Sequence, residues 1–353
     1  MPRAYNQWSE EEIERLRELR AEGRFSAEIA QIVGRSVNSV ANKIQDLGIP
    51  MGKRPVAEEP VVVSRPIDPE ETAEEIIARQ KKRFRRKKEA EKERSLIDVR
   101  VNIEGPIAIA HFGDPHLDDD GTDWERLEAD IETVKSTEGM FAANVGDYTN
   151  NWVGRLVQQY EHQHVTRTEG HVLTEWLFKE LPWLYLIGGN HDAWNGGNDV
   201  LGWLAKSVGT RYEAWGARIA LRFPNGAECR INARHDFKGH SQFNPAHGPT
   251  KASKMGFADG RDHIYTCGHK HTFGYLQWAP GPGMICHCIQ VNAYKQMDPY
   301  AKQLGFVEHE HAPCVVTVID PDYADVPERF VTVFTDVQEA AEFLAFKRRR
   351  KAA

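Results

Sequence analysis

The stretch Leu184-Tyr185-Leu186-Ile187-Gly188-Gly189-Asn190-His191-Asp192 joins an apolar run to a polar turn. The apolar run predicts a buried strand. Open α/β sheets bind ligands at the carboxyl ends of their strands, so the polar turn lies where a ligand site is expected. It offers an amide oxygen, an imidazole and a carboxylate. A single turn of this kind is a weak indication, and its weight depends on whether other strands end in the same way.

Further strand-like runs, at residues 107–110, 141–145, 230–233 and 264–267, also end in residues that bind metals. The candidate ligands after the runs are Asp114, His116, Asp147, Asn190, His235, His269 and His271. In extended backbone, residues i and i+2 point to the same side, so the two Asp-x-His and His-x-His pairs can each present two ligands. His240 and His247 lie close to His235 in the sequence, but only His235 follows a strand directly. Carboxylates, imidazoles and an amide oxygen suit Mn, Fe or Zn better than Ca or Mg.

Glycine precedes the ligand sets, which predicts sharp turns packed close to the ions. These glycines are Gly113, Gly146, Gly189 and Gly268. The five cysteines are not spaced like a zinc knuckle. Alternation along a strand would place Cys286 and Cys288 on one face, which favours small buried residues over a metal site.

The ordered set of motifs resembles the calcineurin-like metallophosphoesterase superfamily over about residues 104–335. The resemblance implies a four-layer α/β/β/α sandwich and two divalent metal ions, Mn²⁺ foremost, with Fe or Zn as alternatives. It implies that one ion is held by Asp114, His116, Asp147 and His271, and the other by Asp147, Asn190, His235 and His269. It also implies that His191 contacts the substrate phosphate and protonates the leaving oxygen, and that Asp192 orients a histidine.

The chain departs from the protein phosphatases of this superfamily in two places. Those enzymes usually carry acid and arginine residues after the Gly-Asp motif, where this chain has Tyr148-Thr149-Asn150-Asn151, and they end the later motif in Glu, where this chain has Asp192. Both departures favour a nuclease, nucleotidase or phosphodiesterase.

Residues 1–52 predict a separate unit of three short helices, near residues 10–22, 26–33 and 36–47. Ser9 and Glu12 form a capping-box pattern, and a tight turn at Gly34 before the last helix is typical of a helix-turn-helix. The last helix is expected to bury Val37 with the apolar residues that follow it. Its polar side, with the residues at its start, consists of Arg35, Ser36, Asn38, Ser39, Asn42 and Lys43.

Those polar side chains are suited to contact bases or phosphates of DNA. The segments Trp8-Ser9-Glu10-Glu11 and Ser39-Val40-Ala41-Asn42-Lys43-Ile44 resemble Myb/SANT-like and GcrA-like DNA-binding domains. A helical protein-interaction module is the alternative.

The rest of the chain predicts three further segments. Residues 53–98 form a linker and a basic helix, residues 99–335 form the α/β domain, and residues 336–353 form a C-terminal helix with a basic tail from residue 347. Within the α/β domain, residues 152–180 predict one long helical stretch and residues 211–237 predict antiparallel strands. The net charge is −7, so the basic residues 79–94 indicate either a local nucleic-acid contact or a solvated helix.

These observations together predict a metal-dependent phosphodiesterase or nuclease that acts on DNA and is tethered by its own helix-turn-helix. One alternative is a small-molecule nucleotide phosphoesterase that the N-terminal unit localises, and another is a non-catalytic DNA-binding regulator. The architecture suits a phage or prophage protein. No signal peptide and no apolar run of membrane-spanning length is found, which predicts a cytoplasmic protein without membrane contact. No feature predicts an oligomeric state.

Overall fold

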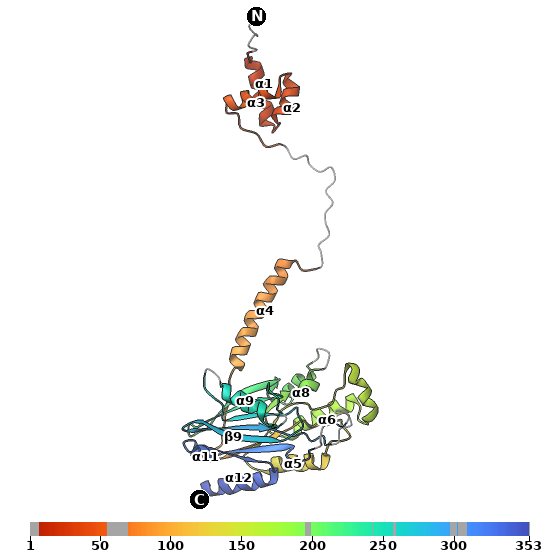
Figure 1. Cartoon of the computed structure of the whole chain (residues 1–353), viewed down its shortest axis with the longest axis vertical. Helices are drawn as coiled ribbons and strands as arrows, with labels where there is room; N and C mark the ends of the chain where they lie inside the picture. Colours follow the sequence, from red (N-terminus) through yellow and green to blue (C-terminus); the bar gives the residue numbers. More distant parts are fainter. Residues whose placement is uncertain are drawn as a thin grey trace. The chain divides into compact units, whose positions relative to one another are not determined.

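A computed structural model of the protein describes residues 7–54, 70–194, 199–241, 243–256, 259–296, 302 and 309–352. The chain divides into two compact units, Met1–Ile77 and Ala78–Ala353 (Figure 1). The division falls inside helix α4 (Ala73–Arg94), earlier than the expected start of the α/β domain at residue 99. Most of that basic helix therefore belongs with the second unit.

The first unit contains the three predicted helices, α1 (Glu10–Ala21), α2 (Ser26–Val33) and α3 (Val37–Asp46). Ser9 and Glu12 form the predicted capping box of α1, and α2 ends at Gly34 with a φ of 70°. The core is a small apolar cluster of Leu16, Leu19, Ile29, Ala30, Val40 and Ile44. The expectation that Val37 is buried is wrong, because Val37 is 47% exposed in the first turn of α3, before the helix reaches the core that Val40 and Ile44 share.

Helix α4 is a 22-residue helix in which no residue is buried. Its first turn is acidic and its last turn basic, an order that suits the helix dipole. Arg94, at the end of α4, pairs with Glu213 at 3.6 Å, and both residues belong to the second unit.

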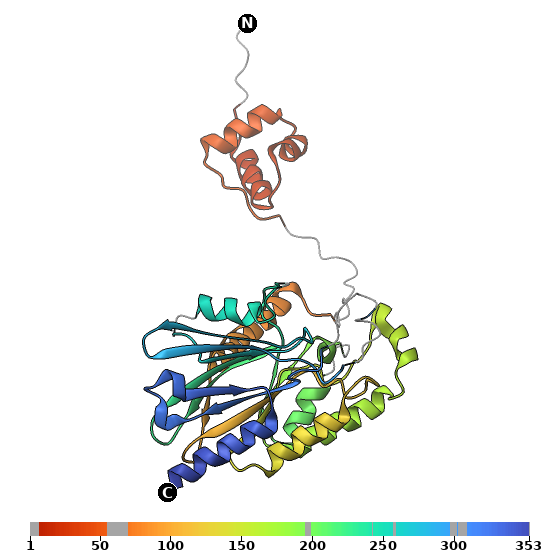
Figure 2. The ribbon, with the colours of Figure 1, turned by 60° about the horizontal axis from the view of Figure 1, so that its bottom comes forward.

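The second unit is an α/β structure built on two mixed six-stranded sheets (Figure 2). Sheet I has the strand order β12-β11-β2-β3-β4-β5, and β2 to β5 run parallel. Sheet II has the order β1-β6-β7-β8-β10-β9. The strands are β1 (Ile97–Arg100), β2 (Ile107–Phe112), β3 (Met140–Asn144), β4 (Trp183–Gly188), β5 (Tyr212–Ala214), β6 (Gly216–Arg222), β7 (Glu228–Arg234), β8 (Ile264–Cys267), β9 (Gly274–Gly281), β10 (Met284–Gln290), β11 (Cys314–Ile319) and β12 (Val331–Phe334).

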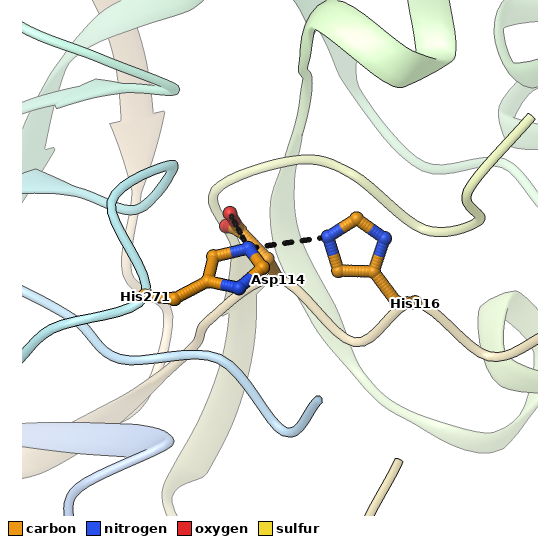
Figure 3. A group of neighbouring side chains, drawn as sticks. All are labelled: Asp114, His116 and His271. Carbon is orange, nitrogen blue, oxygen red and sulfur yellow. Dashed lines mark hydrogen bonds and ion pairs between the residues drawn. The ribbon is translucent and has the colours of Figure 1, made fainter. Parts of the chain in front are cut away.

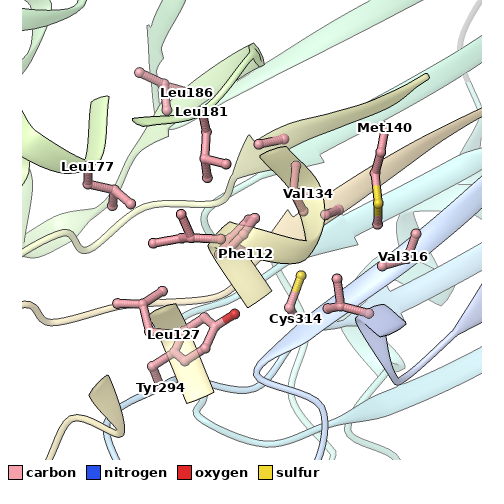
Figure 4. Close-up of a cluster of buried hydrophobic side chains, with 14 of the residues drawn as sticks. Phe112, Leu127, Val134, Met140, Leu177, Leu181, Leu186, Tyr294, Cys314 and Val316 are labelled. Carbon is pink, nitrogen blue, oxygen red and sulfur yellow. The ribbon is translucent and has the colours of Figure 1, made fainter. Parts of the chain in front are cut away.

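Both faces of sheet I are covered, which explains why β2 is buried at every position. Alternate residues of β2, such as Ala110 and Phe112, pack on a cluster with four helices (Figure 4). These helices are α5 (Trp124–Ser136), α6 (Arg167–Glu180), α8 (Val200–Ser207) and α12 (Val337–Ala352). Ile107 and Ile109 point the other way, into a second cluster shared with strands of sheet II. Near α9 (His247–Met255), a smaller cluster lies on sheet II.

Three sequence-based expectations about this unit need correction. Residues 152–180 are not one helical stretch but a 3₁₀ segment η1 (Gly154–His162) followed by α6, because Thr166 starts α6 with its own capping box. Only β6 and β7 form the expected antiparallel pair, whereas β5 joins sheet I in parallel with β4. Helix α12 continues through the expected basic tail, where Lys347 pairs with Asp320 at 2.8 Å.

The short remaining elements are α7 (Asn190–Ala193), η2 (Pro321–Tyr323) and α11 (Pro327–Phe330). All five cysteines are buried and form no disulfide, which for Cys286 and Cys288 agrees with the expectation of small buried residues. Among the residues that the structure describes, no helix has both the length and the apolar character needed to cross a bilayer.

Candidate metal centre

The predicted ligands meet beyond the carboxyl ends of strands from both sheets. Within the part of the chain that the structure describes, three groups of side chains have ligand atoms within 4.8 Å of one another. The groups are Asp114–His116–His271, His116–Asp147–His191 and Asp147–His235–His269. They overlap through His116 and Asp147, so they form one continuous cluster.

The first group brings loops after β2 and β8 together (Figure 3). His271 Nε2 lies 3.4 Å from Asp114 Oδ2 and 3.3 Å from His116 Nε2. Asp114 Oδ1 is buried and has no hydrogen-bond partner among the residues that the structure describes. Buried polar atoms are normally satisfied, so this oxygen indicates that a further group, such as a cation, belongs here.

The third group, Asp147–His235–His269, converges on one nitrogen of His235. His235 Nε2 lies 3.1 Å from Asp147 Oδ2, 2.9 Å from Asn190 Oδ1 and 3.1 Å from His269 Nδ1. The other ring nitrogen, Nδ1, lies 2.9 Å from the Val145 carbonyl oxygen. A carbonyl only accepts, so Nδ1 carries a proton, and in the neutral ring Nε2 presents its lone pair to the cluster, as metal-binding histidines do.

Glycines let the loops approach the ligands closely. A Cβ atom on Gly189 would lie 2.1 Å from Asp147 Oδ1, and one on Gly268 would lie 2.2 Å from Asp114 Oδ1. Gly146 has a φ of 117°, which a side chain would also disfavour.

The ligand loops are not extended, contrary to the geometry assumed for the i, i+2 pairs. His116, Asp147, His269 and His271 have φ values of 41°, 55°, 72° and 47°. The backbone therefore turns between His269 and His271, and the two rings enter different groups.

His191 belongs to the group that links the other two, together with His116 and Asp147. Its amide donates to Asp147 Oδ1 at 3.0 Å, and its Nε2 lies 3.9 Å from Asp147 Oδ2. Its Nδ1 contacts the Asn150 carbonyl oxygen. The ring packs between the rings of Trp152 and Trp194, with centroids 5.3 Å and 4.3 Å away.

Asp192 is buried and ties two ligand loops together. It accepts hydrogen bonds from the amides of Asp147, Tyr148 and Gly189 at 2.8, 3.1 and 2.7 Å. These contacts hold backbone, and the expectation that Asp192 orients a histidine stays a prediction. The backbone they hold carries the Asp147 ligand.

Burial and charge shift the pKa values of this cluster in the metal-free protein. Burial opposes the charged forms of Asp147 and His235, but their mutual attraction outweighs it, lowering the pKa of Asp147 to about 2 and raising that of His235 to about 10. Burial and the nearby Asp147 charge raise the pKa of Asp192 to about 7. Burial lowers the pKa values of His116 and His191, which favours neutral rings.

The donor set fits a divalent cation. It combines buried carboxylates, imidazoles and the Asn190 amide oxygen, and the buried Asp114 Oδ1 has no partner among the described residues. Nitrogen and oxygen donors of this kind suit borderline transition-metal ions. The buried His/Asp cluster can therefore hold a metal ion.

The expected DNA-contacting residues lie on or next to α3. Asn38 and Asn42 are exposed, while Ser39 and Lys43 are half-buried. Ser36 caps α3 by accepting from the Ser39 amide at 3.3 Å.

Arg35 is held inside the first unit. Its Nε and one terminal nitrogen lie 2.9 and 2.8 Å from the two Glu12 carboxylate oxygens, and its guanidinium stacks 4.4 Å from the Trp8 ring centroid. These contacts favour a structural role for Arg35.

Sequence reasoning missed two residues beside His191, namely Asn150 and Lys295. Asn150 lies in a quoted motif, but no role was predicted for it. Lys295 has no local sequence signal, because it reaches the cluster only through the fold. Comparison with protein-family models gives no match for the chain, and no curated protein matches it either. What the centre can do is therefore inferred from its geometry.

Proposed function

We propose that this chain is a metal-dependent phosphodiesterase that acts on DNA and belongs to the calcineurin-like metallophosphoesterases. In this proposal, the two mixed sheets and their flanking helices form the α/β/β/α sandwich of that superfamily. Two divalent ions, Mn²⁺ foremost, bind beside each other. Asp114, His116 and His271 hold the first ion, Asn190, His235 and His269 hold the second, and Asp147 bridges them.

The observation that carries the proposal is the shared position of Asp147. It lies in one ligand group with His116 and in another with His235 and His269. A buried carboxylate between two sets of imidazoles is the arrangement that a two-ion centre needs, since both ions must share a ligand at a short separation.

The chemistry assigned to this chain is phosphodiester hydrolysis. Bound divalent ions would lower the pKa of a water and neutralise charge on the phosphate oxygens. His191 stands at the edge of the ligand cluster, and its Nδ1 is occupied by the Asn150 carbonyl. Its Nε2 is then the atom that donates a proton to the leaving oxygen. Asp192 keeps the Asp147 and Gly189 loops in register through their amides.

The proposed DNA contact uses the first unit and α4. The exposed face of α3 carries Asn38 and Asn42, with Lys43 beside them, and α4 adds a row of exposed basic side chains. Amides of Asn can pair with adenine edges, and lysines contact phosphates. Tethering through such a contact raises the local concentration of DNA near the metal centre.

The test combines metal analysis with a choice of substrates. Purified protein loaded with Mn²⁺ is incubated with single- and double-stranded DNA, with mononucleotides and with cyclic nucleotides. DNA cleavage that disappears in Asp147→Asn and His191→Gln, but survives in the exposed His164→Gln control, supports the proposal.

The other outcomes separate the alternatives. Turnover of mononucleotides or cyclic nucleotides without DNA cleavage would indicate a small-molecule phosphoesterase. Stoichiometric DNA binding with neither bound metal nor hydrolysis would indicate a non-catalytic DNA-binding protein.

A further inference from the structure

Asn150 is held from every side, although it is not one of the predicted ligands. Asn150 is fully buried, at 0% exposure. Its amide donates to Asp118 Oδ1 at 2.7 Å. Its side-chain nitrogen donates to Asp119 Oδ2 at 2.7 Å and to Gln163 Oε1 at 3.1 Å. Both amide hydrogens of the side chain are thus used.

A buried lysine, Lys295, completes the hydrogen-bond network around the Asn150 side chain. Lys295 Nζ lies 3.3 Å from Asn150 Oδ1 and 2.9 Å from Asp119 Oδ2, and the Lys295 side chain is 1% exposed. A buried charge is tolerated only when it is paired, and Asp119 provides the pair. Gln163 Nε2 also donates to Asp118 Oδ2 at 3.0 Å, so the side chains of Gln163 and Asn150 together link Asp118 to Asp119. We call these residues, Asn150 with Asp118, Asp119, Gln163 and Lys295, the Asn150 clamp.

The Asn150 clamp leaves one group of Asn150 for another partner, the backbone carbonyl, and that carbonyl contacts His191 Nδ1. A carbonyl oxygen can only accept, so the contact requires a proton on Nδ1. The Nδ1–H tautomer is the less common one in unconstrained histidine. A second tie comes from Asn151, whose side chain donates to the His191 carbonyl at 2.7 Å.

We infer that the Asn150 clamp is a positioning device that fixes the ring orientation and Nδ1–H tautomer of His191, so that Nε2 faces the reacting phosphate. The inference rests on the proposed function, in which His191 protonates the leaving oxygen. In place of a side-chain carboxylate, the chain uses a backbone carbonyl whose position is set by four side chains. Lys295, far along the chain from Asn150, acts on His191 through this clamp.

Two variants weaken the clamp to different degrees. Asn150→Ala removes all its side-chain contacts. Gln163→Ala removes one contact to Asn150, one to Asp118 and one to the Val165 carbonyl, and because Gln163 is only half-buried it is the variant that is expected to fold most readily.

The matched control is Asn225→Ala. The Asn225 side chain makes two hydrogen bonds, to the Pro321 carbonyl and from the Ala227 amide, but it lies in the β6–β7 turn, at the opposite end of β7 from His235. Circular dichroism and thermal unfolding establish that each full-length variant folds.

The first measurement is the tautomer of His191 in the full chain, metal-free and labelled with ¹⁵N-histidine, with the His191 signals assigned by their loss in His191→Gln. The wild type and Asn225→Ala are expected to show the Nδ1–H form. Asn150→Ala is expected to shift His191 towards the Nε2–H form, and Gln163→Ala to shift it less. An Nε2–H ring in the wild type, or the same Nδ1–H ring in every folded variant, would overturn the inference.

The second measurement compares two phosphodiesters under Mn²⁺. A 4-nitrophenyl phosphodiester releases nitrophenolate, which leaves without taking up a proton. A dinucleotide releases an alkoxide, which needs a proton. Asn150→Ala should lower kcat on the dinucleotide by about tenfold to a hundredfold and leave the nitrophenyl ester within a few-fold, because only the first reaction depends on general-acid help. A merely structural defect would lower both rates equally, which would count against positioning.

The two measurements separate two kinds of failure. A wild type that hydrolyses neither ester overturns the proposed function, and the tautomer measurement then still decides whether Asn150 orients His191. An active wild type whose variants lose both esters in parallel and keep the tautomer overturns the clamp alone.

Discussion

Replacement of Gly189 by alanine tests whether the loop after β4 fixes the position of the Asp147 ligand. The backbone of Gly189, with φ −100° and ψ −169°, is open to any residue, so the substitution carries no conformational penalty of its own. Its effect is steric. The new Cβ would lie 2.1 Å from Asp147 Oδ1 and 2.7 Å from His235 Cε1, closer than the 3.0 Å below which Cβ contacts are essentially not found.

The displacement of the Asp147 carboxylate determines the expected losses of stability and of Mn²⁺ affinity. Asp147 Oδ1 would have to retreat by about 1 Å, and overpacking of this kind costs about 1–3 kcal/mol of stability. Loss of supporting geometry around a metal site typically lowers affinity about tenfold to a hundredfold, which is about 1.4–2.7 kcal/mol. We therefore expect Mn²⁺ to bind Gly189→Ala about tenfold to a hundredfold more weakly than the wild type, with a larger loss of turnover.

The assay is isothermal titration of the metal-free protein with Mn²⁺. The control is Gly281→Ala, at the exposed end of β9, where a Cβ meets no atom within 4 Å. The control should bind Mn²⁺ as the wild type does. Unchanged Mn²⁺ affinity in a folded Gly189→Ala protein would show that Asp147 is not a ligand held against this loop.

Four further outcomes are expected. Mn²⁺ binding near pH 7 should release about one proton, because the ion needs a neutral His235 ring. In the metal-free protein that ring is protonated, since Asp147 outweighs the effect of burial and raises its pKa to about 10. Calorimetric titration in buffers of different ionisation enthalpy measures the number of protons released. Because of the same raised pKa, the contribution of His235 to the stability of the metal-free protein is fully present below pH 6.5 and is lost as the pH rises towards 10. The free energy of unfolding, measured with urea, should therefore fall over that range more for the wild type than for His235→Gln. Asn42→Ala should weaken DNA binding in fluorescence anisotropy by about 1–3 kcal/mol if Asn42 reads a base, with Gln31→Ala on α2 as control and with nitrophenyl ester hydrolysis unchanged. Leu16→Ala should destabilise the first unit by about 2–5 kcal/mol and abolish DNA binding while metal affinity persists, because Leu16 is fully buried in a core separate from the metal centre; loss of metal binding in that variant would contradict the division of the chain.

Local signals predict many of the elements because they act within a few residues. The capping pattern at Ser9 and Glu12 and the apolar spacing in α1 do not depend on the rest of the fold. Helix α2 begins and ends where the pattern predicts, at Ser26 and Val33. The polar turns after strands are local too, and the ligands found in them form the three observed groups.

The missed features depend on contacts between distant segments. Strand β5 has only three residues, and its place beside β4 is set by tertiary packing and not by its own alternation. The break at residues 163–166 follows from Thr166 capping α6 and from Gln163 reaching Asp118. The Asn150 clamp joins residues as far apart as Asp119 and Lys295, and periodicity carries no information about such pairs.

The conformations of the ligand loops explain how one short turn serves two groups. Left-handed backbone costs a non-glycine residue about 1–2 kcal/mol, less for Asp and His than for bulkier residues, and it persists only where the surroundings enforce it. His269 and His271 both adopt it, with φ values of 72° and 47°. In an extended segment their rings would point to the same side and reach only one group. The turn sends His269 to His235 and His271 to Asp114 instead. The His269 amide, bound to Asp114 Oδ2 at 2.7 Å, holds that turn without an ion. The backbone therefore sets the ligand positions, and a cation would bind to a geometry that the fold already maintains.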